Sequence, residues 1–168
     1  MTDLAVLSRH ANEQLRATKE APIARDVALL AVRIALVWIF VYHGAGTLFG
    51  AFGQPGLHGQ AVFFADVAHL HPGTFFAVLS GVIEWVGGIA VGLGVFGRLA
   101  ASALVGDMVM AMVTVTWHNG IVSHAAGSGY ELNIALAALA LVIVLLGTGR
   151  FSLDVLLRRQ WASFRAGP

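Results

Sequence analysis

Five ionisable side chains stand inside or at the edges of long apolar segments of this sequence. They are Arg33, His43, Glu84, Asp107 and Glu131. Charged groups are costly in the hydrocarbon core of a bilayer, and where they occur they usually pair, line an internal cavity or form a proton path. Glu84 is the lone carboxylate of the segment SGVIEWVGGIAVGLGVFGR. It is therefore the first candidate for a functional group.

The composition places these segments in a membrane. Of 168 residues, 58% are hydrophobic and only 11% are charged, and the mean hydropathy is +0.80. Most lysines and arginines precede Val27 or follow Gly149. A soluble domain spreads its charges over surface faces, whereas this chain keeps long stretches nearly free of them. The sequence therefore predicts a single-domain integral membrane protein.

Four segments are long and apolar enough to be membrane spans. About twenty residues of helix, rising 1.5 Å each, cross a hydrocarbon core of about 30 Å. The predicted spans are about 27–48, 74–96, 99–117 and 130–147. We expect an amphipathic helix within residues 1–26 that ends at Pro22, a short interfacial helix within residues 60–73, and a basic interfacial helix over 150–168. The predicted fold class is an all-α bundle of four transmembrane helices with amphipathic cytoplasmic helices at both termini.

The distribution of positive charge predicts the orientation. Four lysines and arginines precede the first span, Arg98 lies between the second and third, and the rest of the flanking arginines follow the fourth. The first and third connections contain no lysine or arginine. The positive-inside rule therefore predicts a multi-pass protein of the cell membrane with both termini in the cytoplasm.

Residue counting from the cytoplasmic end gives each ionisable group a depth. Arg33 lies about a third of the way across, Asp107 slightly deeper and Glu84 near the middle, while His43 and Glu131 lie in the outer third. Helical spacing predicts that these groups face into the bundle. On the second span the expected inward face is a close-packing stripe of Gly81, Glu84, Gly88 and Gly92. On the fourth span the expected inward face is Glu131, Ala135, Ala138 and Val142.

Each of these groups also has a purely structural interpretation. Arg33 can reach the cytoplasmic head groups or pair with Asp107. Glu84 is too deep to reach the head groups, so it is protonated, hydrogen-bonded within the bundle or part of a pocket. Glu131 can anchor the helix at the interface, and His43 can be a hydrogen-bonding histidine of the core. The sequence leaves these alternatives open.

No metal or covalently bound cofactor is clearly encoded. The chain has no cysteine, which excludes disulfides, cysteine-ligated zinc or iron–sulfur sites, and c-type haem. The seven histidines show no diagnostic metal-binding spacing. A b-type haem held by His43 and His118 is geometrically conceivable, but there is no second matched pair, so the sequence does not favour one. The net charge of +1 gives no support for nucleic-acid binding.

The order of several motifs resembles the DoxX family of bacterial and archaeal membrane proteins. The resemblance runs from the first span to Asp154 through HGAGTLFGAFGQPGLHG, SGVIEWVGG, LGVFGRLAA and GYELNIALAALALVIVLLGTGRFSLD. Members typically carry an arginine in the first span and HGxxKL at its end. Arg33, His43 and Gly44 match this pattern, and Thr47 stands where the lysine usually is. The closing G-x-G-R-x-S-x-D motif also matches, at residues 147–154.

The resemblance implies a four-helix membrane protein associated with redox complexes. Family members look like membrane subunits of quinone-linked sulfur oxidation, or like partners that hold soluble oxidoreductases and antioxidant enzymes at the membrane. No redox centre is evident in this chain, so its electrons are expected from other subunits. The alternative hypotheses are a non-catalytic anchor that docks partners through its amphipathic ends and, behind it, a small transporter or proton path.

Together, the buried acids and the resemblance lead to the hypothesis of a quinone or lipid pocket around Glu84. Such a pocket needs an apolar slot with hydrogen-bonding or acid–base groups at the ring oxygens. The aromatic side chains Trp85, Trp117 and Phe40 are candidates to line it. The candidate ligand or proton-path residues are Glu84, His43, Asp107, Arg33, Glu131 and Trp85.

Overall fold

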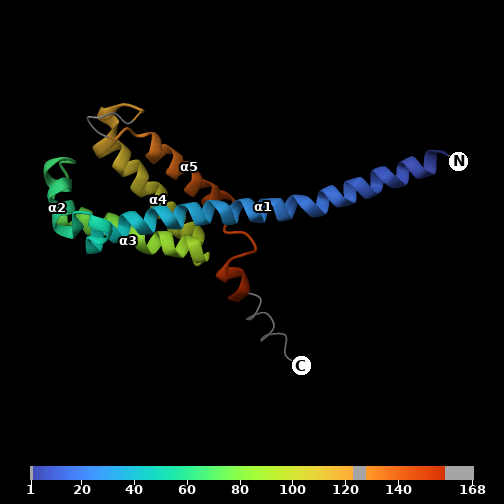
Figure 1. Cartoon of the computed structure of the whole chain (residues 1–168), viewed down its shortest axis with the longest axis horizontal. Helices are drawn as coiled ribbons and strands as arrows, with labels where there is room; N and C mark the ends of the chain where they lie inside the picture. Colours follow the sequence, from blue (N-terminus) through green and yellow to red (C-terminus); the bar gives the residue numbers. More distant parts are fainter. Residues whose placement is uncertain (1, 123–127, 158–168) are drawn as a thin grey trace, which may run out of the picture.

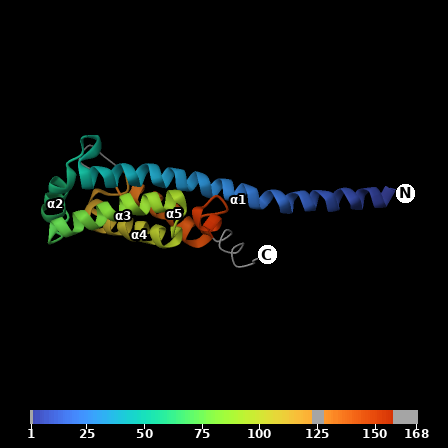
Figure 2. The ribbon, with the colours of Figure 1, turned by 90° about the horizontal axis from the view of Figure 1, so that it is seen from below.

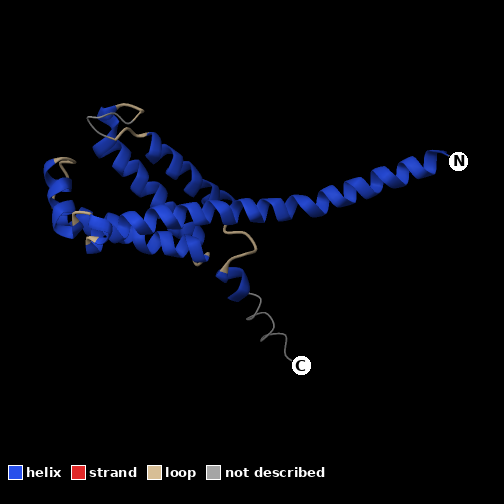
Figure 3. Ribbon diagram, in the orientation of Figure 1, coloured by secondary structure: helices blue, strands red, loops and turns tan. Residues whose placement is uncertain are grey.

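The computed structural model describes residues 2–122 and 128–157, with side chains described from residue 23 onward. All the regular structure of these residues is helical (Figure 3). The order is α1 (Thr2–Phe49), η1 (Ala51–Gly53), α2 (Gly56–Asp66), α3 (Gly73–Leu93), α4 (Gly97–Ala111), η2 (Met112–Thr116), η3 (Trp117–Asn119) and α5 (Glu131–Leu146). η1 and η3 are 3₁₀ turns, and η2 is a π-helical turn. The predicted all-α fold is confirmed.

Three helical stretches are long and apolar enough to cross a membrane. They are Ile23–Phe49, Gly73–Leu93 and Gly97–Asn119, and they correspond to the first three predicted spans. α5 is also apolar but has 16 residues. At 1.5 Å per residue it is about 24 Å long, which is less than the roughly 30 Å of a hydrocarbon core. The chain is a multi-pass membrane protein.

α1 is one continuous helix of 48 residues, with Pro22 inside it. The expectation that Pro22 ends a separate N-terminal helix is therefore wrong. A proline in a helix removes one hydrogen bond and costs about 3 kcal/mol. That local cost is outweighed because good helix-forming residues precede the proline and the packed transmembrane segment follows it. The N-terminal part of α1 extends well beyond the other helices (Figure 1).

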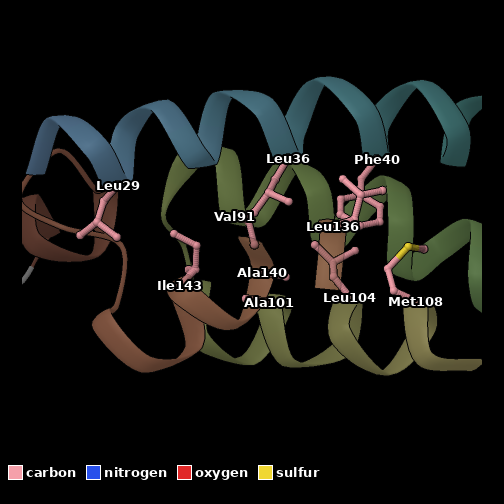
Figure 4. Close-up of a cluster of buried hydrophobic side chains, with 10 residues drawn as sticks. All are labelled: Leu29, Leu36, Phe40, Val91, Ala101, Leu104, Met108, Leu136, Ala140 and Ile143. Carbon is pink, nitrogen blue, oxygen red and sulfur yellow. The ribbon is translucent and has the colours of Figure 1, made fainter. Parts of the chain in front are cut away.

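The core of the bundle lies between α1 on one side and α3, α4 and α5 on the other (Figure 2). Ten buried side chains from all four helices form it (Figure 4). They are Leu29, Leu36, Phe40, Val91, Ala101, Leu104, Met108, Leu136, Ala140 and Ile143. Many large apolar side chains on the outer faces are exposed, including Trp38 and Leu99. This arrangement is the one expected when the outer surface faces lipid.

α2 covers the end of the bundle that lies opposite the N-terminus (Figure 1). The sequence predicted a short helix within residues 60–73, whereas the helix begins earlier, at Gly56, and ends at Asp66. Pro55 immediately precedes it with a φ of −64°, which suits a helix start. Phe64 of α2 is buried in a second apolar cluster with Ala68 and Ala77. α2 is therefore fixed against α3 by packing.

The C-terminal helix is only partly covered by the described residues. Residues 153–157 are helical, as expected for its first turn. The arginines of the predicted basic helix from residue 158 onward lie outside the described residues, as do the side chains of the predicted amphipathic helix before residue 23.

Glycines bring α1 and α3 into close contact. Gly44 of α1 lies directly against the backbone of Trp85 in α3, where an added Cβ would overlap it. An added Cβ at Gly92 would lie 2.9 Å from the Cβ of Val37. The predicted glycine stripe of α3 therefore packs on α1, as small residues do between membrane helices.

Replacing Gly44 by alanine is expected to lower the free energy of unfolding in detergent by about 1–3 kcal/mol, the usual cost of overpacking. The added methyl group has to displace the backbone of α3 at Trp85. Thermal unfolding followed by circular dichroism measures the effect. Gly106→Ala is the matched control, because an added Cβ there meets nothing within 4 Å and alanine favours helix over glycine. Equal unfolding temperatures for the two variants would contradict the close packing.

Candidate functional site

A polar pocket of about 180 Å³ lies between the transmembrane helices and α2. Its polar lining consists of His43, Thr47, Gln54, Gln60, Ser80, Glu84, Asp107 and Thr116. Its apolar lining consists of Phe63, Phe64, Met108, Ala111 and Val115. These residues come from α1, the segment after η1, α2, α3, α4 and η2. Three of the predicted site residues, His43, Glu84 and Asp107, therefore meet in one place.

Two carboxyl groups dominate the pocket. Asp107 is only 4% exposed, and its Oδ1 has no hydrogen-bond partner among the described residues. The hydroxyl of Ser80 interacts with the same carboxyl group, and the carboxyl of Glu84 is close enough to interact with it electrostatically. No lysine or arginine lines this described pocket. A buried polar atom without a partner costs about 1–3 kcal/mol, a cost that a bound ligand, ion or water removes.

The helix periodicity carries both acids inward. Asp107 shares the buried face of α4 with Leu104 and Met108, which belong to the core. Packing of that face therefore fixes the direction of the carboxyl group. Ser80 lies one helical turn before Glu84, so the two share a face of α3. The predicted inward direction of Glu84 and Asp107 is confirmed.

The pocket wall includes the π-helical turn η2, which directly continues α4. Thr116 at its end donates a 3.2 Å hydrogen bond from Oγ1 to Oδ1 of Asn133 in α5. Nδ2 of Asn133 in turn approaches Sδ of Met108 at 3.8 Å. π-Helical turns within α-helices occur frequently at functional sites. Here Thr116, at the end of the turn, both lines the pocket and binds Asn133 of α5.

A family model described as DoxX matches residues 28–117, which is just over half of the chain. The chain belongs to the DoxX family. Every residue that lines the polar pocket lies between His43 and Thr116, so the whole pocket falls inside the matched region. No curated protein and no solved structure matches the chain.

In this DoxX-family protein, Arg33 lies outside the pocket and is only 2% exposed. It does not pair with Asp107, the partner considered from the sequence. Its guanidinium donates instead to four backbone carbonyls, those of Val91 (2.9 Å), Gly92 (2.6 Å), Thr148 (2.9 Å) and Phe151 (2.6 Å). The last carbonyls of a helix have no partner within it and carry partial negative charge. Arg33 binds two of those of α3, at Val91 and Gly92, and joins them to the segment after α5.

The closing DoxX motif holds the same end of the bundle. Gly147 and Gly149 have φ values of +79° and +72°, which favour glycine. Nε of Arg150 forms a 2.9 Å salt bridge with Oδ2 of Asp26. The hydroxyl of Ser152 donates to the carbonyl of Gly149 at 3.0 Å, so Ser152 is buried against the loop. The motif thus ties the segment after α5 to α1.

The remaining candidate residues of this DoxX-family chain also lie outside the pocket lining. Glu131 is exposed at the start of α5. Trp85 packs edge-on against Phe49, with ring centroids 5.3 Å apart. Trp117 stacks on Tyr130, also at 5.3 Å. The aromatic side chains that line the pocket come from α2 instead, as Phe63 and Phe64.

The residues considered for the quinone slot and for a haem site are also not brought together. Phe40 is in the bundle core rather than at the pocket. His43 lines the pocket, whereas His118 is exposed in η3 and does not line it. Across the described ranges, no three histidine or carboxylate side chains are grouped so that they could hold a metal ion.

The inward face of α5 differs from the predicted one. The sequence predicted Glu131, Ala135, Ala138 and Val142. The structure buries Leu136, Ala140 and Ile143 and leaves Glu131, Ala135 and Ala138 exposed. Small residues occur on every side of this helix, so their spacing does not select a face. The larger Leu136 and Ile143 decide it because they fill the core.

Sequence reasoning missed the part of the DoxX-family pocket that is contributed by loops and α2. Gln54 and Gln60 belong to the glycine-rich segment between the first two spans, and they reach the pocket because α2 folds back over the bundle. The available signal was the presence of two uncharged amide side chains in an otherwise apolar segment. That signal becomes specific only when the path of the segment is known.

Proposed function

We propose that this DoxX-family protein is a membrane subunit of an oxidoreductase assembly and that its polar pocket binds the ring of a quinone or quinol. The observation that carries the proposal is the pair of the half-buried Glu84 and the buried Asp107, which share one pocket and leave Oδ1 of Asp107 without a partner. A quinone ring needs apolar walls and polar groups at its two oxygens. Phe63 and Phe64 supply the first, and the carboxyl groups supply the second.

The size of the pocket supports a ring rather than a whole lipid. Its volume of about 180 Å³ is below the roughly 300–1,000 Å³ typical of pockets for drug-sized ligands. A second, almost purely apolar groove of about 410 Å³ lies on α1, lined by Val37, Trp38, Val41, Tyr42 and Phe52. Tyr42 of the groove precedes His43 of the pocket, and Nε2 of Gln54 makes a long 3.5 Å hydrogen bond to the carbonyl of Tyr42. We place the ring in the pocket and the apolar tail along this groove.

The residues of the pocket fit the proton chemistry of such a ligand. A bound quinone supplies two-electron, two-proton chemistry. Glu84 and Asp107 lie in the pocket where they can hold or release protons at the ring oxygens. His43 lines the pocket and is exposed, so it suits proton exchange between the pocket and its surroundings.

The electron carrier in this proposal belongs to a partner subunit, because the chain has no cysteine and no evident redox centre of its own. The positive-inside rule supports an orientation in the cell membrane with both termini in the cytoplasm. In that orientation the N-terminal part of α1, which extends beyond the bundle, is accessible to a partner (Figure 1). The same feature favours the second candidate function, a non-catalytic anchor for partner proteins.

The test is ligand binding by the purified protein in detergent, measured by isothermal titration with a short-chain quinone and with its hydroquinone. Glu84→Leu removes one carboxyl group from the pocket at similar volume. It is expected to weaken the tighter of the two ligands by about tenfold or more, the effect of losing one hydrogen bond to a charged group. Glu131→Leu is the control, because Glu131 lies outside the pocket lining. Unchanged affinity in Glu84→Leu contradicts the proposal.

A further inference from the structure

The pocket contains a hydrogen-bond acceptor that lacks a donor within the protein. Three of its potential donors already have acceptors within the protein. The hydroxyl of Thr116 binds Asn133, the amide nitrogen of Gln54 binds the carbonyl of Tyr42, and the hydroxyl of Ser80 interacts with Asp107. The carboxyl groups of Glu84 and Asp107 also line the pocket. The group that the described pocket leaves unmet is Oδ1 of Asp107, and an oxygen acceptor needs a donor.

The protein has no cation nearby to supply that donor. No lysine or arginine is among the described lining residues. Arg33, the buried arginine of α1, donates instead to four backbone carbonyls, two at the C-terminal end of α3 and two in the segment after α5. Thr47, which is buried in the pocket wall, is uncharged. The Thr47 hydroxyl, the Gln60 amide and the His43 ring are neutral donors of the lining, but none of them reaches this oxygen. A donor from a bound ligand would complete the site.

We infer that the pocket selects the reduced form of its ligand, the hydroquinone, over the oxidised quinone. The two oxygens of a quinone only accept hydrogen bonds, whereas the two hydroxyl groups of a hydroquinone also donate. One hydroxyl donates to Oδ1 of Asp107, and the apolar walls of Phe63 and Phe64 accept the ring equally well in either form. This inference rests on the proposed function, because it specifies which redox form occupies the same pocket.

The test compares three probes with the purified full-length protein under anaerobic conditions. They are trimethylhydroquinone, the corresponding trimethylbenzoquinone, and the dimethyl ether of the hydroquinone, which keeps the ring and has no O–H donor. The wild type is expected to bind the hydroquinone at least about tenfold more tightly than either other probe. Asp107→Asn is expected to remove most of this preference, because an amide oxygen accepts more weakly than a carboxylate and the amide nitrogen can donate to a quinone oxygen. Asp66→Asn makes the same chemical change at an exposed position outside the pocket and is expected to keep the preference.

Each outcome decides between the two proposals. A preference for hydroquinone that Asp107→Asn loses and Asp66→Asn keeps supports the inference. If the quinone or the dimethyl ether binds the wild type as tightly as the hydroquinone does, the inference is wrong and the quinone pocket stands. If none of the probes binds, both the inference and the proposed function are wrong. The comparison of the hydroquinone with its dimethyl ether uses the wild type alone, so it does not depend on the folding of any variant.

Discussion

Arg33→Met is expected to lower the free energy of unfolding in detergent by about 3–5 kcal/mol, placing it among the most damaging single substitutions in the chain. Methionine has a similar length but no donors, so four carbonyls at the end of α3 and in the segment after α5 lose the guanidinium. The carbonyl of Val91 keeps a second donor, the N–H of Gly94. The same change unties α1 from both segments. The unfolding temperature in detergent and the yield of folded protein from membranes measure the effect.

Two further variants separate this role from the presence of a positive charge. Arg33→Lys keeps the charge but offers one compact ammonium instead of a planar fork, so it is expected to recover only part of the loss. Arg98→Met removes an exposed arginine with a single long hydrogen bond of 3.4 Å to the carbonyl of Leu145, and its cost is expected to be about 1 kcal/mol or less. Equal unfolding temperatures for Arg33→Met and Arg98→Met would contradict the assigned role of Arg33.

The case of Arg33 shows why its role was not predictable from the sequence. Residue counting placed it at a depth close to that of Asp107, and a buried arginine next to an acid suggests an ion pair. Its actual partners are backbone carbonyls. Every residue has a carbonyl, so such a partner leaves no signature in the sequence. Residue counting predicts how deep a group lies in the membrane, but not which group of the next helix it contacts.

The fold was predictable where a property extends over many residues. Long apolar segments and clustered charges identified the spans, and the spacing of glycines identified the face of α3 that packs on α1. Prediction failed where tertiary packing outweighed a local sequence rule. Pro22 did not end α1, because one lost hydrogen bond is small beside the packing of a long helix. The face of α5 was misassigned because its alanines surround the helix, and only Leu136 and Ile143 distinguish the core side.

The part of the candidate site that lies on the transmembrane helices was predictable, and the part contributed by α2 was not. Glu84 and Asp107 lie on helices whose packed faces are fixed by neighbouring apolar and small residues, so their direction followed from helical spacing. Gln60 and Phe64 reach the pocket only because α2 returns over the end of the bundle. That return depends on the tertiary packing of Phe64 against Ala77, which joins positions on different helices.

Thr47→Lys is expected to abolish ligand binding while leaving the protein at least as stable as the wild type. Thr47 is 8% exposed and lines the pocket, and it stands at the position where the DoxX resemblance implies a lysine. A lysine side chain there carries an ammonium toward Glu84 and Asp107 and supplies the donor that Oδ1 of Asp107 lacks. It also occupies part of a cavity of about 180 Å³. We expect hydroquinone affinity to fall by about a hundredfold or more, equivalent to about 2.7 kcal/mol.

Thr47→Met is the matched control, because it adds a similar length without a charge. It is expected to block the pocket as well, but its unfolding temperature should fall below that of Thr47→Lys, since methionine leaves the two acids without a cation and covers Oδ1 of Asp107 with an apolar group. If the acids need a donor, isothermal titration shows that both variants lose the ligand. Thermal unfolding then separates them, because only the lysine variant keeps its stability. If Thr47→Lys binds the ligand with wild-type affinity, the ligand does not occupy this pocket. If instead Thr47→Lys is the less stable of the two variants, the acids do not require a donor. The desolvation cost of the buried ammonium then exceeds its favourable interaction with the two carboxyl groups.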